Sequence, residues 1–326
     1  MADLTTRYMG LELRNPIIVG SSGLTDSLEK IKHLNENGAG AVVLKSIFEE
    51  QIMMEASSMK TESMPHTEEA DYITQYTRSH NLNRYLKLVK EARDSVDIPV
   101  IASINCVSND QWVDFSRQIE DAGAAALELN LFIMPGDPRQ TGEQIESTYF
   151  AIVKSIQEKI KIPLAVKIGH YFSGLANFVF NLSVRGVKAI VLFNRFYRPD
   201  VDLEKEVIVS ASVFSKPDEI SLPLRWVGLL SDEVKCDLAA STGVHDGHGV
   251  AKCLLAGARA VHVASCLYKH GPEYIASMVK QLEQWMQSHH YSRIRDFTGK
   301  LSIRSGQDPV LYERAQFMKY FSNAKT

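Results

Sequence analysis

The residues best suited to chemistry in this chain follow short apolar runs, at the points where buried strands would end. Lys45 follows the run 42–44, Lys167 follows 164–166, and Asn194 follows 190–193. Small or polar residues hold the matching positions after the other runs: Ser21, Ser46, Ser103, Asn130, Thr242, Gly243, Ala264 and Ser265. Parallel α/β folds carry their chemistry at the carboxyl ends of the strands. The sequence therefore predicts one site at these strand ends.

A repeated junction indicates the elements that position these residues. Four times a stretch with helical periodicity ends in a glycine, and a short apolar run follows, at residues 38–43, 123–127, 186–191 and 257–261. Glycine ends a helix readily because it adopts positive φ without a Cβ clash. The runs are apolar on both faces, as buried parallel strands are. Eight such strands between residues 16 and 265 predict an α/β fold, a (β/α)₈ TIM barrel.

Helical periodicity and capping residues predict the outer layer of this barrel. Helices are expected from residue 26 or 27 to 37, and over 109–121, 142–160, 174–184, 247–255 and 272–286. Residues 47–80 and 195–223 do not fit a bare barrel, and the alternating stretch 207–213 predicts an added strand or hairpin. Insertions of this kind cover the carboxyl-terminal face of the strands. We expect a single domain over residues 1–326, with a tail from about 302.

Composition narrows the class of protein. A net charge of −3 and a pI near 6.4 predict no nucleic-acid partner. No apolar run approaches the roughly 20 residues that span a bilayer, so no membrane association is expected. Residues 1–5 lack the features of a signal peptide, and the four cysteines form no CxxC pair, which together favour a cytoplasmic protein. His245 and His248 are spaced too loosely for a metal site, and a loop with a helix cap is favoured there.

Several motifs, taken in order, resemble those of one enzyme family. Residues 15–22 resemble NPxxxASG, 43–46 resemble xxKS, 128–131 resemble the start of ELNxSCPN, 165–167 resemble VK, Asn194 resembles the Asn after strand 6, and 271–300 resemble the C-terminal helix and tail. Over roughly residues 5–301 the chain resembles the dihydroorotate dehydrogenases, chiefly the soluble class 1 branch. The resemblance implies a (β/α)₈ barrel that holds FMN above the carboxyl ends of its strands, and a homodimer.

The same resemblance assigns roles to the strand-end residues. Lys167 would hold its cation near flavin N1, where negative charge develops on reduction, and would thus be catalytic. Backbone N–H groups at Thr242, Gly243, Ala264 and Ser265 would hold the phosphate, although the family usually has Gly-Gly and Gly-Thr there. The remaining cofactor ligands would be Ser21, Lys45, Ser46, Ser103, Asn130 and Asn194. Lys45 could instead lie at the surface, the two asparagines could instead satisfy loop backbone, and Glu128 could pair with Lys167 or Lys45.

The residues that bind dihydroorotate and accept its proton in this family are not matched in this chain. Ile133 stands where class 1 enzymes have the Cys that accepts a proton from dihydroorotate, and an alkyl side chain cannot act as a base. Pro135 replaces a substrate-binding Asn, and no counterpart of the family's substrate loop is found in residues 55–82, where Asn81 and Asn83 are possible substitutes. His170 is the histidine placed to act as a replacement acid or base, and Cys106 is a weaker alternative.

These observations favour an FMN-dependent oxidoreductase that transfers hydride at flavin N5, acts on CH–CH groups of a small molecule, and need not use dihydroorotate. One alternative is a genuine dihydroorotate dehydrogenase of pyrimidine biosynthesis with a displaced base. Another is a non-redox barrel, either a lyase that uses Lys167 as a Schiff base or a flavin-holding subunit without its own substrate. The sequence leaves the electron acceptor open.

Overall fold

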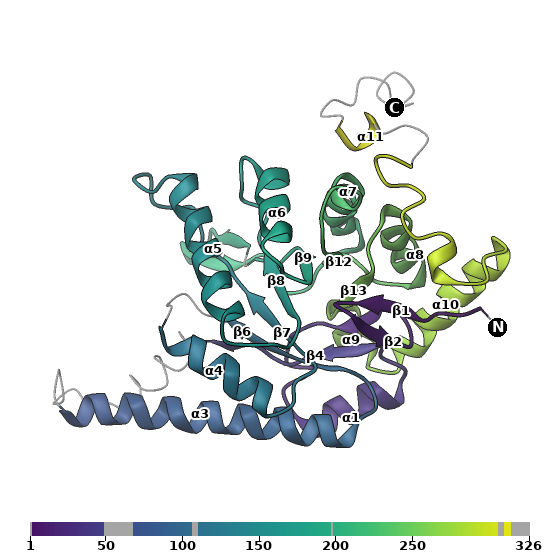
Figure 1. Cartoon of the computed structure of the whole chain (residues 1–326). Coiled ribbons are helices and arrows are strands. Elements are labelled where there is room, and N and C mark those ends of the chain that lie inside the picture. The colour runs from purple at the N-terminus through teal and green to yellow at the C-terminus, as the bar shows by residue number, and fades with distance from the viewer. Residues whose placement is uncertain (1, 49–67, 106–109, 197, 306–309, 314–326) are drawn as a thin grey trace.

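Eight parallel strands close into a barrel in the computed structural model of this chain (Figure 1). The structure describes residues 2–48, 68–105, 110–196, 198–305 and 310–313, and gives the backbone alone at 48, 68–80, 110–112 and 310. The strands are β3 (Ile17–Val19), β4 (Ala41–Val43), β6 (Val100–Asn105), β7 (Ala126–Asn130), β8 (Leu164–Ile168), β9 (Ala189–Leu192), β12 (Asp237–Ser241) and β13 (Ala260–Val263). The predicted TIM barrel is confirmed.

Two pairings complete the barrel, one between its first and last strands and one between its second and third strands. Strand β3 pairs with β13, with Ile18 opposite His262, and β4 pairs with β6, with Val43 opposite Ile101. A two-residue strand, β5 (Ile47–Phe48), adds to the edge of β6. Every barrel strand therefore has a parallel neighbour on each side, which leaves the barrel without an open edge.

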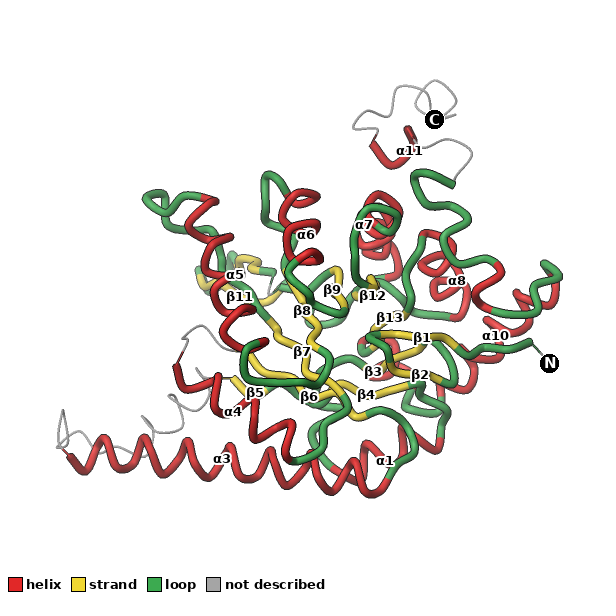
Figure 2. The backbone as a smooth tube through the Cα atoms, viewed as in Figure 1, coloured by secondary structure: helices red, strands yellow, loops and turns green. Residues whose placement is uncertain are grey.

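Helices surround the strands on the outside, as Figure 2 shows. They are α1 (Leu28–Glu36), α3 (Glu68–Ser95), α4 (Asp110–Asp121), α5 (Gly142–Gln157), α6 (Leu175–Val184), α7 (Ser221–Leu230), α8 (Gly247–Ala256), α9 (Ser265–His270), α10 (Tyr274–Ser288) and α11 (Val310–Glu313), with 3₁₀ turns η1 (Pro217–Ile220) and η2 (Ile294–Asp296). The six predicted helices are confirmed as α1, α4, α5, α6, α8 and α10, within a few residues at their ends. No helix of the described ranges is long and apolar enough to cross a membrane.

The four glycine junctions have the backbone conformation that their sequence predicts. Gly38, Gly123, Gly186 and Gly257 have φ of 94°, 91°, 90° and 116°. Each lies between a helix and the next barrel strand, and Gly257 is the C-cap residue of α8. A Cβ would be strained at these angles, so glycine at these positions fixes where each strand begins.

An N-terminal hairpin, which the sequence analysis did not predict, packs into the interior of the barrel. It comprises β1 (Thr6–Tyr8) and β2 (Leu11–Leu13), and it brings Tyr8, Met9 and Leu13 into one buried cluster with the barrel strands. Most of the side chains that the strands contribute to this cluster are small, namely Ala41, Ala126, Ala165, Ala189, Ala239 and Ala260, and the others are Ile18, Val43, Ile101 and Val191. The alanines leave room for the larger residues, so the hairpin fills space that branched side chains occupy in other barrels.

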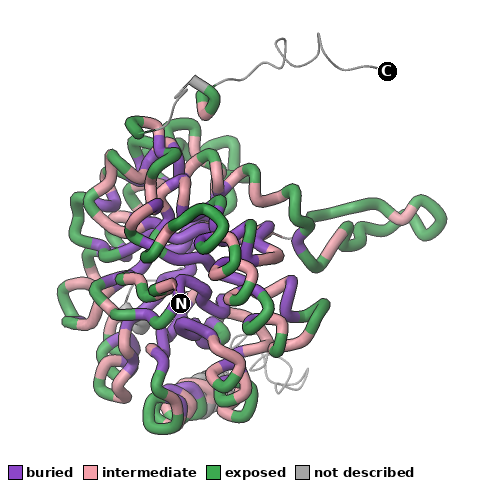
Figure 3. The backbone as a smooth tube through the Cα atoms, turned by 90° about the vertical axis from the view of Figure 1, so that its right-hand side faces the viewer, coloured by how far each residue is buried: buried purple, intermediate pink, exposed green. Residues whose placement is uncertain are grey.

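A second hairpin follows β9 and confirms the added strands predicted within residues 195–223. It comprises β10 (Pro199–Asp202) and β11 (Val207–Ser210), paired antiparallel. Figure 3 shows it as an exposed arm that projects from a body with buried strands. Leu203 is 83% exposed and Ile208 is 73% exposed on this arm. Of the other predicted insertion, residues 49–67 lie outside the described residues, and residues from 68 onward begin α3.

Candidate active site

A cavity of about 420 Å³ lies at the carboxyl ends of β3, β8, β9, β12 and β13. Its size is within the range of small-molecule sites, about 300–1,000 Å³. Seven residues singled out from the sequence are among those that line it: Ser21, Lys167, Asn194, Thr242, Gly243, Ala264 and Ser265. They come from five strand ends and are separated by up to 244 positions, so only closure of the barrel brings them together.

Three of the other predicted ligands connect to this cavity through hydrogen bonds. The Ser21 hydroxyl lies 2.9 Å from the Ser46 hydroxyl, which lies 2.7 Å from the Ser103 hydroxyl. Asn194 Nδ2 donates to Asn130 Oδ1 over 2.8 Å, and thus bridges the ends of β7 and β9 on either side of β8. Lys45 is exposed and does not line the cavity, which is the surface position that the sequence left open.

Lys167 is almost fully buried and interacts with a carboxylate deeper in the barrel. Lys167 is 8% exposed and Glu128 is 1% exposed. Burial raises the pKa of Glu128, and the nearby Lys167 cation opposes this rise. Of the two partners that the sequence offered for Glu128, the structure therefore favours Lys167 over the exposed Lys45. A buried cation near an acid is retained at lower cost than an unpaired one.

His262 lies on β13 and contributes a second buried group beneath the cavity. Its Nδ1 lies 3.7 Å from Glu128 Oε2, and its ring also lines the cavity. Burial lowers the pKa of His262 well below its usual value, and Lys167 lowers it further, so the ring is neutral at pH 7. Neither ring nitrogen has a hydrogen-bond partner among the described residues. The sequence analysis did not single out this residue.

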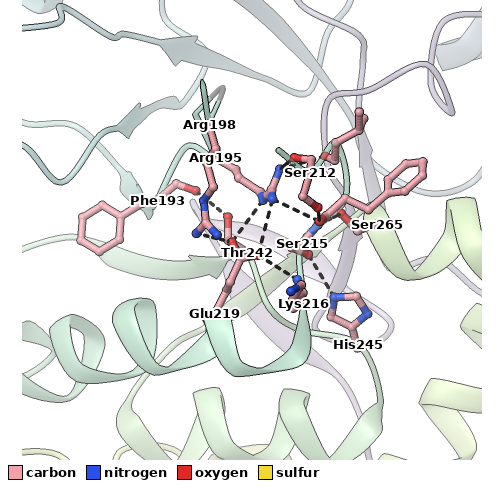
Figure 4. A network of polar contacts seen from close by, with 12 residues as sticks. Phe193, Arg195, Arg198, Ser212, Ser215, Lys216, Glu219, Thr242, His245 and Ser265 are labelled. Atoms are coloured by element: carbon pink, nitrogen blue, oxygen red, sulfur yellow. Dashed lines mark hydrogen bonds and ion pairs between the residues drawn. The ribbon is translucent and has the colours of Figure 1, made fainter. Parts of the chain in front are cut away.

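One carboxylate and two arginines hold the segment 212–219, of which residues 213–215 line the cavity (Figure 4). Glu219 Oε2 lies 3.1 Å from Arg195 Nε and 2.8 Å from Arg198 Nη2. Arg195 also donates to the carbonyl oxygens of residues 212, 213 and 214. Burial favours a higher pKa for Glu219, but the Arg195 and Lys216 hydrogen bonds and the arginine charges together lower it.

The middle of this segment is anchored to α9 and to the loop between β12 and α8. The Ser215 N–H donates to Ser265 Oγ over 3.0 Å, and Ser215 Oγ lies 3.0 Å from His245 Nε2 (Figure 4). Lys269 Nζ donates to the Ser215 carbonyl oxygen over 3.1 Å. Asp246 caps α8 through Gly249 N–H, which confirms the predicted loop and helix cap. Within the described ranges, no three His, Cys, Asp or Glu side chains are grouped to hold a metal ion.

His170, the predicted replacement base, lies beside this cavity rather than in its lining. It lines a neighbouring cavity of about 430 Å³, which shares Asn194, Arg195, Ser241 and Thr242 with the first. Burial and the Arg198 charge lower its pKa, and its buried Nδ1 has no partner among the described residues. The alternative base, Cys106, lies outside the described residues. Neither Asn81 nor Asn83, both on α3, lines either cavity.

Comparison with known proteins identifies the family. A family model of dihydroorotate dehydrogenase matches residues 3–286. The chain belongs to the dihydroorotate dehydrogenase family. It is accordingly a flavin-dependent oxidoreductase of the class that acts on CH–CH groups.

Members of two branches of this family are similar to the chain to the same degree. The catalytic subunit of dihydroorotate dehydrogenase B (NAD(+)) from Thermoplasma volcanium is 24% identical, covering 92% of this chain and 98% of its own length. Dihydroorotate dehydrogenase A (fumarate) from Lactococcus lactis subsp. lactis is also 24% identical, covering 91% of this chain and 99% of its own length. The two relatives differ in the electron acceptor that their names state, so identity does not select an acceptor for this family member.

The donor set of the cavity of about 420 Å³ fits a flavin mononucleotide. The Lys167 ammonium, the Asn194 amide and several hydroxyls offer the cation and donors that an isoalloxazine ring uses. At the other end of the lining, α9 begins after Ala264 without a side-chain cap, so its first N–H groups remain available for a phosphate. Gly243, with φ of 79°, has no room for a side chain, because a Cβ there would clash with the backbone of Ile220. Among the described residues, this lining contains no carboxylate.

Proposed function

We propose that this protein is an FMN-dependent oxidoreductase that transfers hydride at flavin N5 and whose natural substrate is not dihydroorotate. The observation that carries the proposal is the convergence of Lys167 and six other strand-end residues on one cavity, whose described lining residues include no acid. Bound FMN would supply the two-electron acceptor. The protein's contribution is to bind the cofactor, orient it and hold a cation where negative charge develops.

Each group of residues has a separate part in this proposal. Lys167, kept close to Glu128 within the barrel, supplies the preorganised cation near flavin N1. The hydroxyls that link Ser21, Ser46 and Ser103 orient donors toward the ring and ribityl chain. Backbone N–H groups at Thr242, Gly243, Ala264 and Ser265 hold the phosphate.

The cofactor test uses the purified protein and one pair of variants. Denaturation should release FMN and not FAD, because the chain has no GxGxxG fingerprint for a dinucleotide. Ala264→Asp adds a carboxylate at the phosphate end and should weaken FMN binding on reconstitution, whereas Ala211→Asp on the exposed segment after β11 should not. Release of FAD, or failure to bind any flavin after reconstitution, would contradict the proposal.

A second candidate function is a genuine dihydroorotate dehydrogenase that uses His170 as its base. The lowered pKa of His170 favours it, because a ring that is neutral at pH 7 can accept a proton. Its place in the adjoining cavity, and the alkyl side chain of Ile133 at the usual base position, support the first candidate instead. Reactivity toward dihydroorotate separates the two, because only the second candidate should be reduced rapidly by it.

We further propose that the protein works in the cytoplasm as a homodimer whose interface includes the β10–β11 arm. Val201, Leu203 and Ile208 expose 57%, 83% and 73% of their surfaces on a two-stranded ribbon, which is unstable alone in water. Light scattering at micromolar concentration should give twice the mass of the chain. Leu203→Asp with Ile208→Asp should yield a monomer, and a dimer that survives both changes would place the interface elsewhere.

A further inference from the structure

The carboxyl-terminal end of the barrel near Lys167 is walled by aromatic rings. Gly169 follows Lys167 by two residues, and in extended backbone such residues face the same side. A Cβ at Gly169 would lie 2.6 Å from Phe196 Cζ and 3.2 Å from Phe132 Cδ2. The two rings therefore lie against the backbone just beyond Lys167, with centroids 3.8 Å apart. Glycine is required at this position because any side chain would displace them.

This aromatic wall continues into the cavity of about 430 Å³. Phe196, Tyr171 and His170 all line that cavity. The Tyr171 ring centroid lies 5.3 Å from that of Phe196 and 4.3 Å from that of His170, and Tyr171 is 45% exposed. The lowered pKa of His170 keeps its ring uncharged at neutral pH. A ligand in this cavity therefore meets flat, mostly apolar surfaces on one side.

Arg198, at the rim of this cavity, has guanidinium N–H groups that form no hydrogen bond among the described residues. Arg195 uses Nε and both terminal nitrogens on Glu219 and on backbone carbonyl oxygens. Arg198, whose side chain is 53% exposed, donates from Nη2 to Glu219, and no other hydrogen bond of its guanidinium is seen within the described residues. Of the two acids in the lining, Glu219 is already held by both arginines and Asp218 is exposed. Arg198 can therefore take an additional anionic partner.

We infer that this cavity is the substrate site and that it takes a planar aromatic carboxylate, with the ring against Phe196 and Tyr171 and the carboxylate on Arg198. The inference rests on the proposed function, since it places the substrate next to the flavin cavity, with which this cavity shares Asn194 and Thr242. Aromatic rings favour flat partners through offset or edge contacts. An arginine fork adds charge-assisted hydrogen bonds to a carboxylate. A carboxylate on a saturated ring would gain the hydrogen bonds to Arg198 but not the aromatic contacts.

The test measures binding of three probes to the FMN-loaded protein by calorimetry and by the visible flavin spectrum. The probes are trans-cinnamate, 3-cyclohexylpropanoate, which is equally charged but not flat, and orotate, which is flat but rich in amide groups. We expect trans-cinnamate to bind about 10-fold more tightly than either of the others. Equal or tighter binding of the cyclohexyl compound or of orotate would overturn the inference.

Variants identify the residues responsible. Phe196→Leu should weaken trans-cinnamate binding about 2- to 12-fold and leave 3-cyclohexylpropanoate nearly unchanged. Arg198→Gln should weaken both carboxylates by about 10-fold or more. Phe180→Leu, on an exposed phenylalanine of α6, is the matched control and should change neither. If Phe196→Leu weakens both carboxylates equally, the ring does not recognise planarity and the inference fails.

Ligand binding and flavin loading are measured independently, so this inference and the proposed function can fail separately. Calorimetry detects a ligand whether or not a flavin is bound. A yellow, FMN-containing protein that does not bind trans-cinnamate contradicts the inference alone. A protein that cannot be loaded with flavin, yet binds trans-cinnamate with the dependence on Phe196 and Arg198 described above, contradicts the proposed function alone.

Discussion

Glu128 and His262 face each other inside the barrel, with Oε2 3.7 Å from Nδ1, although their strands are not neighbours in the sheet. Both side chains are almost completely buried, yet Glu128 Oε1 and both His262 nitrogens have no hydrogen-bond partner among the described residues. Burial raises the pKa of the acid and lowers that of the ring. Burial therefore disfavours the charged form of both groups in the folded protein.

His262→Gln should make folding less sensitive to acid. The native ring stays neutral while the unfolded chain binds a proton below about pH 6.5, so stability falls as pH decreases through that value. Between pH 7.5 and 5.5, the wild-type free energy of unfolding should fall by about 1 kcal/mol more than that of the variant. Denaturant titrations at both pH values check this, with His248→Gln on α8 as the histidine control. Equal falls in wild type and His262→Gln would show that the native ring binds the proton.

Lys167→Ala should slow flavin reduction by about 10²-fold or more, because a preorganised cation beside the reduced ring is lost. The change also leaves Glu128 without its neighbouring cation, so some loss of stability is expected. The double variant Lys167→Ala with Glu128→Gln should recover stability and not the rate. Anaerobic stopped-flow with one fixed reductant measures the rate, and an unchanged rate in the single variant would remove Lys167 from the mechanism.

Dihydroorotate should reduce the flavin slowly or not at all. Removal of a proton from carbon needs a base within about 3 Å, and such a base contributes roughly 10²–10⁴-fold. Ile133 offers none, and its N–H donates to Tyr149 OH over 2.9 Å. Ile133→Cys alone should give little activity, because Pro135 still lacks the amide that the substrate needs.

Adding Pro135→Asn to Ile133→Cys should raise the activity further. Anaerobic mixing with dihydroorotate, while flavin absorbance is followed, provides the measurement for all three proteins. Rapid, saturable bleaching of the unmodified protein would contradict the prediction. Loss of that bleaching in His170→Gln would then identify His170 as the base.

Arg195 and Glu219 should be coupled in stability. Either Arg195→Gln or Glu219→Gln leaves a mostly buried charge with fewer partners, and the double-mutant cycle should give a coupling of about 1–3 kcal/mol. The pKa of Glu219 is lowered in the native state, so its contribution is full above about pH 4.5 and is lost as pH falls further. Unfolding titrations at pH 7 and pH 4 measure both effects. Additive single variants would show that the segment 212–219 is held by other contacts.

The barrel was predictable because its signals are local. Each strand contains a short apolar run, and Gly38, Gly123, Gly186 and Gly257 mark the beginnings of four of the eight strands through a conformation that only one residue type adopts easily. Seven of the predicted ligands meet for the same reason, since the carboxyl ends of parallel strands share one edge. A correct strand assignment therefore placed these residues without further information.

The remaining parts of the site depend on contacts between distant segments. Nothing in the sequence near Arg195 indicates that Glu219, 24 positions later, holds it, or that Tyr8 enters the barrel from an N-terminal hairpin. His262 lies inside an apolar run and resembles a structural residue. Phe132 and Phe196 did carry a signal, since each lies two residues after a predicted strand-end asparagine, Asn130 or Asn194.

The pairing of β3 with β13 joins positions 19 and 263, so the barrel cannot close until nearly all of its chain exists. During synthesis on the ribosome, β3 emerges first and keeps a row of unpaired backbone groups until β13 follows. Open strand edges of this kind associate readily with other chains. The soluble yield in a heterologous host should therefore fall when translation pauses between residues 237 and 263, because β3 then stays unpaired for longer.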